Sequence, residues 1–336
     1  MPRPVFLAGI NETGTSMLGC GGNSLNAEAV PGGEPPRAGG VPCVSILIPV
    51  HNRLDLTRAC LDTVFDTADP AIPFEIIVID DCSTDGTAAY LDSLGSRVRA
   101  IRNETRKCFA ENMNMAASHA RSEFLCLLNN DTLLTAGWLA KMLAAARQDP
   151  GIAVVGNRQL TAGTNLLDHA GMVFNAQREP VHLYRGLSAD FRPALVSREF
   201  QCVTAACWLV SRRVFLELGG FDPEFKNSFE DVDFCLRARQ NGYKIFYAAD
   251  SVIYHYGRST PGRNDHENRN AGYFRRKWGE SIVPDIQNYC VIPAPVPHAD
   301  WLARYSHVEQ LQSRHPVIAS ILRSVMRLAT GIAKRL

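Results

Sequence analysis

Two short acidic stretches, separated by about a hundred residues, contain the side chains best suited to chemistry. The first, Leu127–Thr132, ends an apolar run and places one carboxylate, Asp131, among amides. Carboxylate and amide oxygens hold divalent metals, and such metals neutralise the charge of a departing diphosphate. The second, Phe229–Asp233, has two adjacent carboxylates, Glu230 and Asp231, at the start of a helical pattern. Together the two stretches suggest a leaving-group site and a general base.

The composition is that of an ordinary enzyme. The chain has 336 residues, of which 46% are hydrophobic and 21% charged, enough to bury one large core or two moderate ones. The formal net charge is +1 and there is no long block of Lys and Arg, so the sequence does not indicate a nucleic-acid partner.

The cysteines and the N-terminus predict a cytoplasmic protein. Ten cysteines are scattered singly, without a C-x-x-C pair, and several lie in apolar runs, as Cys126 and Cys207 do. Such cysteines behave as small buried hydrophobes and are typical of a reducing compartment. No apolar run approaches the ~18 residues that span a bilayer, and the N-terminus lacks a signal-peptide pattern. We expect a cytoplasmic location, which includes a peripheral one at the inner face of the membrane.

Composition divides the chain into three parts. Of the first forty residues nine are Gly and five are Pro, which predicts a flexible tail over residues 1–40. Residues 41–285 carry the periodic apolar patterns of a folded domain, in which the pattern changes at 156 and separates a half 41–156 from a half 157–285. After a proline-rich connector, residues 298–336 predict a helical arm.

Strands and helices are expected to alternate through the first half of the domain. The patterns predict strands over 44–50, 75–80, 97–102 and 123–128, and helices over 54–67, 84–94, 109–119 and 136–148. This alternation implies right-handed crossovers and a mostly parallel sheet with helices on both faces. Ligands of such sheets bind at the carboxyl ends of the strands. Three polar clusters fall at such ends, so the topology should gather them: residues 51–53, 80–81 and 129–131.

The pattern of apolar residues changes in the second half. The patterns predict strands over 203–210, 243–247 and 251–256, and helices over 213–218, 230–241 and 268–278. Asp233 and Arg237 are one helical turn apart, which predicts an ion pair.

Five motifs stand in order along the chain: Ile48–Arg53, Val78–Thr87, Leu127–Thr132, Gly219–Asp222 with Glu230–Asp233, and Tyr254–Thr260. From about Val41 to Gly279 the chain resembles the family 2 glycosyltransferases of the GT-A fold, in particular the bacterial rhamnosyltransferase-like members. The resemblance implies an α/β fold with a mostly parallel central sheet flanked by helices, to which this chain adds the C-terminal helical arm. It also implies an inverting hexosyltransferase, acting from a UDP- or dTDP-sugar onto a hydroxyl of a glycan or glycolipid in bacterial surface polysaccharide synthesis.

The resemblance also assigns residues to the nucleotide sugar, which the half 41–156 is expected to bind. They are Pro49, His51, Asn52, Arg53, Asp81, Asn129, Asn130 and Arg258. In the family the acid at Asp81 accepts the N3–H of a uracil or thymine ring, and a ring at His51 lies against the base. From the residues alone, Asp81 also suits a turn-forming role with Ser83, and His51 suits a neutral loop position. Asp80 is assigned mainly to the turn.

The stretch Asn129–Asp131 stands where the family carries an Asp-x-Asp metal motif. Asn129 replaces the first acid, so Asp131 is the expected direct ligand of Mg2+ or Mn2+. Because the amide lacks the charge of an acid, metal affinity is expected to depend more on the bound nucleotide. In several relatives a histidine completes the site, which implies His255 as a further ligand. Loop capping for Asp131, and packing beside neighbouring tyrosines for His255, remain open.

Glu230 and Asp231 match the catalytic pair of the family, with Asp231 as general base on the acceptor hydroxyl. Inverting transfer needs a carboxylate on the face opposite the leaving group. The alternative is a simple helix start, because the helix dipole stabilises carboxylates there and makes them weaker bases. Asp233, opposite Arg237, is expected to be structural.

The C-terminal arm is basic and amphipathic over residues 315–336. Its apolar residues recur at helical spacing, it has four cationic residues and it has no acid. This pattern suits peripheral contact with an anionic membrane and a polyprenyl-linked acceptor, and it equally suits packing against protein.

Two other classes of protein compete with this interpretation. A nucleotidylyltransferase would show a glycine-rich, basic phosphate loop after the first strand, and Pro49–Arg53 is not one. A non-catalytic glycan-binding or scaffold protein would fit the substitution at Asn129, whereas Asp131, Glu230 and Asp231 argue against it.

Overall fold

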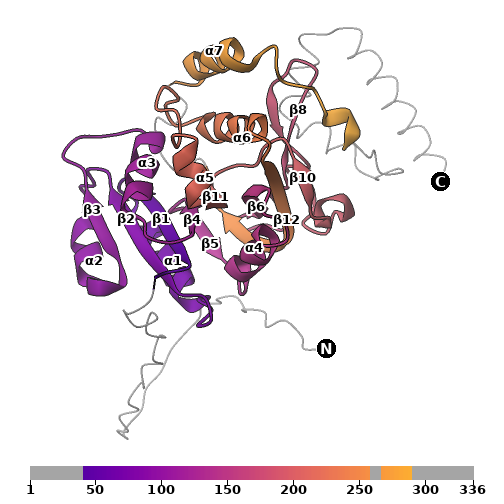
Figure 1. Ribbon diagram of the computed structural model, residues 1–336. Helices are drawn as coiled ribbons and strands as arrows, with labels where there is room; N and C mark the ends of the chain where they lie inside the picture. Colours follow the sequence, from indigo (N-terminus) through magenta and orange to yellow (C-terminus); the bar gives the residue numbers. More distant parts are fainter. Residues whose placement is uncertain (1–40, 258–265, 290–336) are drawn as a thin grey trace, which may run out of the picture. The chain divides into compact units, whose positions relative to one another are not determined.

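The structure is a computed structural model that describes residues 41–257 and 266–289 (Figure 1). The expected tail 1–40, the expected arm 298–336 and Arg258 lie outside the described residues. The expected order of strands and helices in the first half is confirmed. Its elements are β1 (Val44–Val50), α1 (Leu54–Asp66), β2 (Phe74–Asp80), α2 (Thr87–Ser93), β3 (Arg99–Arg102), α3 (Phe109–His119) and β4 (Phe124–Leu128).

The second half contains more strands than the sequence pattern indicates. After β4 the first half continues with β5 (Thr132–Leu134) and α4 (Trp138–Ala146). Strand β6 (Ile152–Thr161) leads into the second half, which contains β7 (Leu167–His169), β8 (Met172–Phe174), β9 (Pro180–His182), β10 (Arg198–Phe200), β11 (Cys207–Ser211), α5 (Arg212–Glu217), α6 (Glu230–Gln240), β12 (Lys244–His255) and α7 (Glu267–Trp278). Short 3-10 turns follow α2, precede β10 and follow α7. The boundary expected at residue 156 lies inside β6.

One large sheet organises the described residues. Its main path runs β10-β12-β6-β11-β4-β1-β2-β3, with β5 paired to β12 and β7 paired to β6. Strands β4, β1, β2 and β3 are parallel neighbours, and β6 is parallel to β12. Strand β11 is antiparallel to β4 and β6, and β10 is antiparallel to β12. The α/β class with a mostly parallel central sheet is therefore confirmed, with antiparallel strands inserted in its second half.

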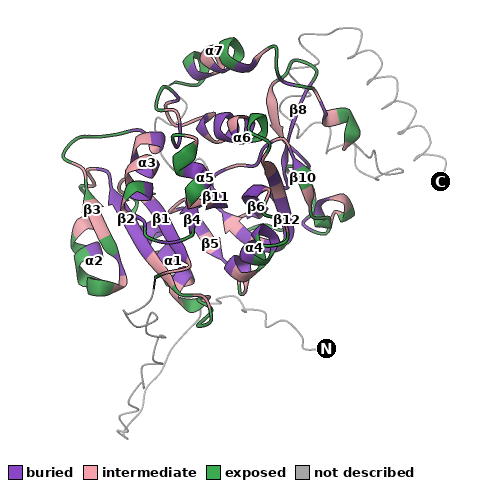
Figure 2. Ribbon diagram, in the orientation of Figure 1, coloured by how far each residue is buried: buried purple, intermediate pink, exposed green. Residues whose placement is uncertain are grey.

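Both faces of the sheet are covered by helices, because the strand side chains alternate between two cores. Leu47 of β1 lies in a core shared with α3, α5, α6 and α7, whereas its neighbours Ile46 and Ile48 lie in a core shared with α1, α2 and α4. Figure 2 shows β1, β2 and β4 buried between these helices, while α2 turns an exposed side to solvent. The carboxyl ends of the parallel strands are thereby held in fixed positions.

Strand β12 corrects one expectation. The sequence pattern predicts two strands, over 243–247 and 251–256, but the structure has one strand that runs from Lys244 to His255. Its pairing with β6 shifts register between Ala248 and Val252, and Asp250 is exposed at this irregularity. The bulge interrupts the alternation of side chains and so mimics a turn in the sequence.

The turn after α5 requires glycine. Gly219 and Gly220 have φ values of 78° and 69°, in the left-handed region. A Cβ atom on Gly220 would lie 2.4 Å from Oδ1 of Asn114, which accepts a 2.8 Å hydrogen bond from the backbone N–H of Phe221. Asn114 Nδ2 donates to the Phe221 carbonyl at 2.8 Å. This clamp joins the turn that leads towards α6 to helix α3.

Candidate active site

The first two polar clusters meet at the carboxyl ends of β1 and β2. The strands pair in register with Val50 opposite Asp80, and the Asp81 N–H donates to the Val50 carbonyl at 2.7 Å. His51, directly after β1, donates from Nδ1 to the Asp81 carbonyl at 2.8 Å and accepts from Asn52 Nδ2 at 3.2 Å. The topology thus brings the residues after β1 and β2 together, as the sequence indicates.

The Asp81 carboxylate is buried and fully engaged. Its Oδ1 accepts hydrogen bonds from Asn103 Nδ2 at 2.7 Å and from the Lys107 N–H at 2.9 Å. Its Oδ2 lies 3.1 Å from Nε of the half-exposed Arg106. Arg106 therefore already pairs with the carboxylate that the resemblance assigns to the nucleotide base. The spacing of residues does not predict this ion pair, because the pair depends on how the loop after β3 folds back.

Asp80, Asn52 and Asp85 build the loops around this position. Asp80 Oδ1 accepts the Ser83 N–H at 3.0 Å, which supports the turn-forming role expected for it. Asn52, with a φ of 54°, accepts the Thr84 N–H on its Oδ1 at 2.7 Å. Asp85 accepts the first N–H of α1, from Leu54, at 2.9 Å, and also bonds Thr87 at the start of α2.

The contacts of Arg53 and Pro49 in the structure are with neighbouring protein residues. Arg53, with a φ of 56°, binds both oxygens of Asp55 at 3.0 and 2.8 Å on an exposed surface. Pro49 is the penultimate residue of β1, opposite Ile79 of β2. Their assignment to the nucleotide sugar remains a prediction from the motif.

The third polar cluster follows β4, which is the parallel neighbour of β1. The Asn129 carbonyl accepts the Thr132 hydroxyl at 2.8 Å, and Asn130 Nδ2 donates to the Thr57 hydroxyl of α1 at 3.0 Å. The Asp131 carbonyl accepts the Tyr256 N–H at 2.9 Å, just beyond the pairing of β5 with the end of β12. This pairing places Asp131 beside the end of β12.

His255 lies between two carboxylates. Its Nε2 is 3.2 Å from Oδ1 of Asp131, and its Nδ1 is 2.9 Å from Oδ2 of Asp168. Burial lowers the pKa of His255, but the two carboxylates outweigh burial and raise the pKa to about 9. The side chains of all three residues are less than one tenth exposed. The sequence linked Asp131 with His255 and missed Asp168, whose only signal is an Asp-His pair between apolar residues.

The pair Asp131 and His255 fits a divalent metal. His255 Nε2 is buried, and its contact with Asp131 lacks the alignment of a hydrogen bond. Adjacent ligands at the ~2.1 Å bond length of Mg2+ lie about 3 Å apart, which matches the separation of the two atoms. Within residues 41–257 and 266–289 no group of three or more His, Cys, Asp or Glu is arranged to hold a metal. If a metal binds here, the described residues would supply two ligands, and phosphate oxygens and water would fill the other positions.

Glu230 and Asp231 begin helix α6. The preceding residue, Phe229, has a φ of 72°, and Asp231 Oδ2 accepts the Ala205 N–H at 3.1 Å. The next residue, Ala206, accepts the Asn129 N–H on its carbonyl at 2.8 Å. Consecutive residues of one loop thus hold both acidic stretches, although the stretches are about a hundred residues apart in the chain. This loop is the feature that joins the base candidate to the metal candidate.

Asp233 has a structural role, as expected. Its fully buried carboxylate accepts from Arg237 Nε at 2.8 Å and from Trp278 Nε1 at 2.8 Å, and it lies 2.7 Å from Lys277 Nζ. Asp233 therefore fixes α6 against α7. Trp208 is also buried, and its ring packs against the ring of Phe221 within the core.

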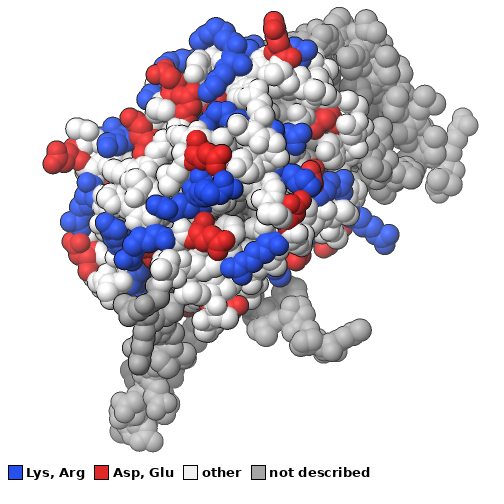
Figure 3. Space-filling model, in the orientation of Figure 1, with Lys and Arg blue, Asp and Glu red and all other residues white. Residues whose placement is uncertain are grey.

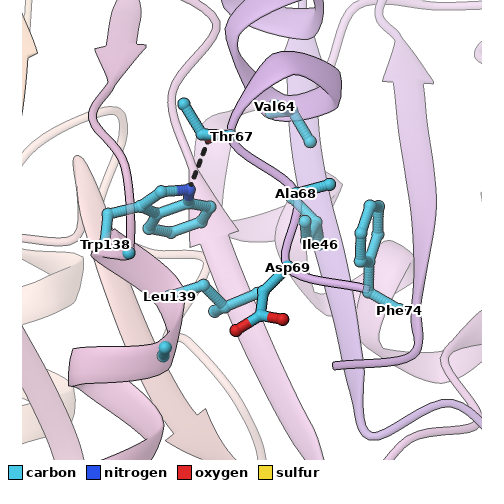
Figure 4. A pocket seen from close by; sticks show the side chains of 10 residues that line it. Ile46, Val64, Thr67, Ala68, Asp69, Phe74, Trp138 and Leu139 are labelled. Atoms are coloured by element: carbon cyan, nitrogen blue, oxygen red, sulfur yellow. Dashed lines mark hydrogen bonds between the residues drawn. The ribbon is translucent and has the colours of Figure 1, made fainter. Parts of the chain in front are cut away.

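Two other features of the described residues are not part of the candidate active site. Figure 3 shows Lys and Arg interspersed with Asp and Glu over the drawn face, without a field of one sign. Figure 4 shows a small pocket lined by Trp138, Phe74 and Ile46 among others, in which Trp138 Nε1 donates to the Thr67 hydroxyl. The end of α1 and the start of α4 form most of its lining. The strand residues that line it are Ile46 in the amino-terminal half of β1 and Phe74, the first residue of β2, so it lies away from the carboxyl ends of these strands.

The fold is shared with glycosyltransferases of the GT-A class. GalNAc-T7, solved with UDP, GalNAc and Mn2+, superimposes with a TM-score of 0.56 at 16% identity over 73% of this chain and 52% of its own. A mannosyltransferase of Pyrobaculum calidifontis, solved with GDP-Man and Mn2+, superimposes with a TM-score of 0.55 at 19% identity over 89% of this chain and 81% of its own. At these identities the likeness shows the fold.

A comparison of the sequence with family models assigns the chain to a family. Residues 45–219 match the model of glycosyl transferase family 2, and the chain belongs to this family. The expectation of a family 2 glycosyltransferase is therefore confirmed.

Relatives include proteins of O-antigen synthesis. The O-antigen biosynthesis protein RfbC of Myxococcus xanthus is 31% identical over 65% of this chain and 17% of its own length. The O-antigen chain rhamnosyltransferase RfbN of Salmonella typhimurium is 29% identical over 65% of this chain and 68% of its own. An uncharacterised protein of Sinorhizobium fredii is 29% identical over 71% of this chain and 28% of its own. The chain thus spans less than a third of RfbC and of the Sinorhizobium protein.

None of the helices formed by the described residues combines the length and the apolar character that a membrane crossing needs.

Proposed function

We propose that the protein is an inverting, metal-dependent glycosyltransferase that moves a hexose or deoxyhexose from a UDP- or dTDP-sugar to a hydroxyl of a growing glycan. The observation that carries the proposal is the meeting of Asp131 with His255, at 3.2 Å, beside the loop that also holds Asp231. Membership in family 2 and the O-antigen relatives support the reaction class and a role in bacterial surface polysaccharide synthesis.

The donor is proposed to lie across the carboxyl ends of β1, β2 and β4. Asp81 accepts the N3–H of the pyrimidine, with Arg106 moving aside or sharing the carboxylate. His51 lies against the base, and Pro49, Asn52, Arg53, Asn129, Asn130 and Arg258 complete the donor site. Asp131 and His255 would hold Mg2+ or Mn2+, and the bound ion would neutralise the charge of the departing diphosphate.

Asp231 is proposed to act as the general base, with Glu230 beside it. The acceptor oxygen attacks the anomeric carbon on the face opposite the diphosphate and loses its proton to Asp231. The bond between the anomeric carbon and the phosphate oxygen breaks, and the electron pair leaves with the nucleoside diphosphate. The hydrogen bond from the Ala205 N–H orients the carboxylate.

The catalytic domain is proposed to span residues 41–285, with the nucleotide sugar bound mainly by 41–156 and the acceptor mainly by 157–285. Residues 315–336 are proposed to contact anionic membrane when the acceptor is polyprenyl-linked. This proposal is based on the charge pattern of the sequence.

A donor panel tests the reaction class. The full chain is incubated with UDP- and dTDP-sugars and Mn2+, and the released product is identified. Nucleoside diphosphate is the expected product. Pyrophosphate would indicate nucleotidyl transfer instead, and silence across the panel would favour a non-catalytic glycan-binding protein.

Asp231→Asn tests the base. We expect transfer to fall by at least ~100-fold, in the range that general base catalysis contributes, while UDP affinity is unchanged. Asp250→Asn, which alters an exposed carboxylate of β12, is the control and should retain activity. Full transfer activity in Asp231→Asn would remove the assignment.

A further inference from the structure

The contact between Asp168 and His255 is built from three fixed groups. Asp168 Oδ2 lies 2.9 Å from His255 Nδ1, while Asp168 Oδ1 lies 2.5 Å from a guanidinium nitrogen of Arg185. The side chain of Asp168 is only 8% exposed. Both oxygens of this carboxylate therefore have a partner, so its position is set from two sides.

The contact selects one form of the histidine ring. Arg185 donates to Asp168 Oδ1, and a guanidinium pairs with the ionised form of a carboxylate. An ionised carboxylate can only accept, so Nδ1 of His255 must carry the hydrogen of this bond. In the neutral ring, Nε2 then carries the free electron pair. That atom faces Asp131.

The backbone gives the contact a rigid frame. Strand β6 pairs with β12 on one side, with Thr161 opposite His255, and with β7 on the other, with Gln159 opposite His169. The Ala162 N–H donates to the His255 carbonyl at 2.9 Å. The Gly186 N–H donates to the Leu167 carbonyl at 2.7 Å, which ties the residue after Arg185 to the residue before Asp168. Strand pairing thus places Asp168 and His255, and the bond from the turn to Leu167 places Arg185 beside Asp168.

We propose that Asp168 is a positioning residue for metal binding: it fixes the orientation and the protonated nitrogen of His255, so that Nε2 is presented beside Asp131 as a ligand. Partners of this kind behind a metal-bound histidine typically change metal affinity by ~10–100-fold. The inference rests on the proposed function and adds Asp168 and its anchor Arg185 to the site. A purely structural ion pair between Asp168 and Arg185 is the competing explanation.

Metal binding itself provides the test. Binding of Mn2+ to the full chain is measured by the electron paramagnetic resonance signal of free Mn2+, with and without UDP or dTDP. We expect Asp168→Ala to weaken Mn2+ binding by 10–100-fold. Asp168→Asn should lose less, because its amide oxygen can still accept from Nδ1, and it keeps the test valid if the alanine variant does not fold. Asp285→Ala is the matched control, since Asp285 is also buried but bonds the Phe174 N–H.

A double-mutant cycle separates positioning from structure. If Asp168 acts through His255, Asp168→Ala should cause no further loss of Mn2+ binding in a His255→Ala background. An equal loss in both backgrounds, or unchanged Mn2+ binding in folded Asp168→Ala, overturns the inference and leaves the proposed function standing. A wild-type chain that binds no Mn2+ with either nucleotide overturns the metal site, and the inference with it.

Discussion

At the scale of single residues, the proposed metal site has a low charge. Asp131 would provide one carboxylate, and His255 a neutral ring once a metal displaces its Nε2 proton, while Asn129 stands where a second acid would add a negative charge. Divalent Mg2+ commonly binds one or two carboxylates together with substrate phosphates. We therefore expect the nucleotide diphosphate to supply much of the negative charge around the metal.

Asp131→Ala tests this dependence. Loss of the single carboxylate should weaken Mn2+ binding and Mn2+-dependent UDP binding by at least about 10-fold each, because each ligand holds the other through the metal. Isothermal titration calorimetry with UDP, with and without Mn2+, measures both effects. Asp62→Ala on the exposed surface of α1 is the control. UDP affinity that stays at the wild-type value with Mn2+ present would contradict the assignment of Asp131.

Part of the site could be predicted residue by residue, and part could not. Asp81, Asp131 and His255 stand at strand ends, where the topology of a parallel sheet gathers ligand-binding groups. Asp168 and Arg106 reach the site through a strand pairing and a loop that carry no local periodic signal. Their contribution depends on long-range contacts, which are not visible in residue spacing.

At the scale of elements, helix α7 holds helix α6 in place. Asp233 of α6 is fully buried and receives hydrogen bonds or ion pairs from Arg237 in its own helix and from Trp278 and Lys277 of α7. The amino-terminal end of α6 carries Asp231, the proposed base. The orientation of the base thus depends on an element that follows it by more than thirty residues.

Trp278→Phe tests whether α7 stabilises α6 through Asp233. It removes a hydrogen bond to a charged, buried acceptor, so we expect a loss of about 1.5–3 kcal/mol in the free energy of unfolding. Trp138→Phe is the matched control: its ring N–H bonds the neutral Thr67 hydroxyl, and the expected loss is about 0.5–1.5 kcal/mol. Urea unfolding measures both. A smaller loss for Trp278→Phe than for Trp138→Phe would show that Asp233 does not need the indole.

Several strands of the second half could not be predicted from the sequence. Helix α3 was predicted with the bounds that the structure has, because a capped amphipathic helix is a local pattern. The bulge near Asp250 divided β12 in the prediction, and β7, β8, β9 and β10 are three residues each, too short for a period to appear. Such strands form because neighbouring strands offer hydrogen bonds.

At the scale of the whole molecule, one buried histidine should make stability sensitive to mild acid. Burial, together with the neighbouring His182, holds the pKa of His169 well below its usual 6.5. The folded protein keeps this ring neutral while the unfolded chain takes up a proton as the pH falls below 6.5. The contribution of His169 therefore lowers the stability of the fold on the acid side, by at most about 1.4 kcal/mol per pH unit.

His169→Gln should flatten that decrease. The free energy of unfolding, measured by urea titration between pH 7.5 and 5.5, is expected to fall less steeply with pH in this variant than in the wild type, even if it is lower at pH 7.5. His266→Gln changes an exposed histidine and should leave the slope as it is. Parallel slopes for His169→Gln and wild type would mean that His169 is not the acid-sensitive group.

The cationic residues of the C-terminal arm provide a test with the full chain. Flotation with vesicles that contain anionic lipid should recover the wild-type protein, and the charge reversals Arg323→Glu and Arg327→Glu together should reduce recovery several-fold, because each cation near such a surface contributes ~1 kcal/mol. Neutral vesicles serve as the control. Equal recovery of both proteins, or of neither, would remove membrane contact from the proposal.

Strand β6 also limits how this protein can be recombined with its relatives. It is hydrogen-bonded to β11 and β12 along its two edges, and it continues through residue 156 without a break. A chimaera that exchanges acceptor specificity by a crossover at 156 would join two unrelated half-strands and would have to restore pairing on both sides. A crossover in the exposed turn at residues 148–150 keeps β6 with the half that follows it. The useful unit of exchange therefore begins before this strand.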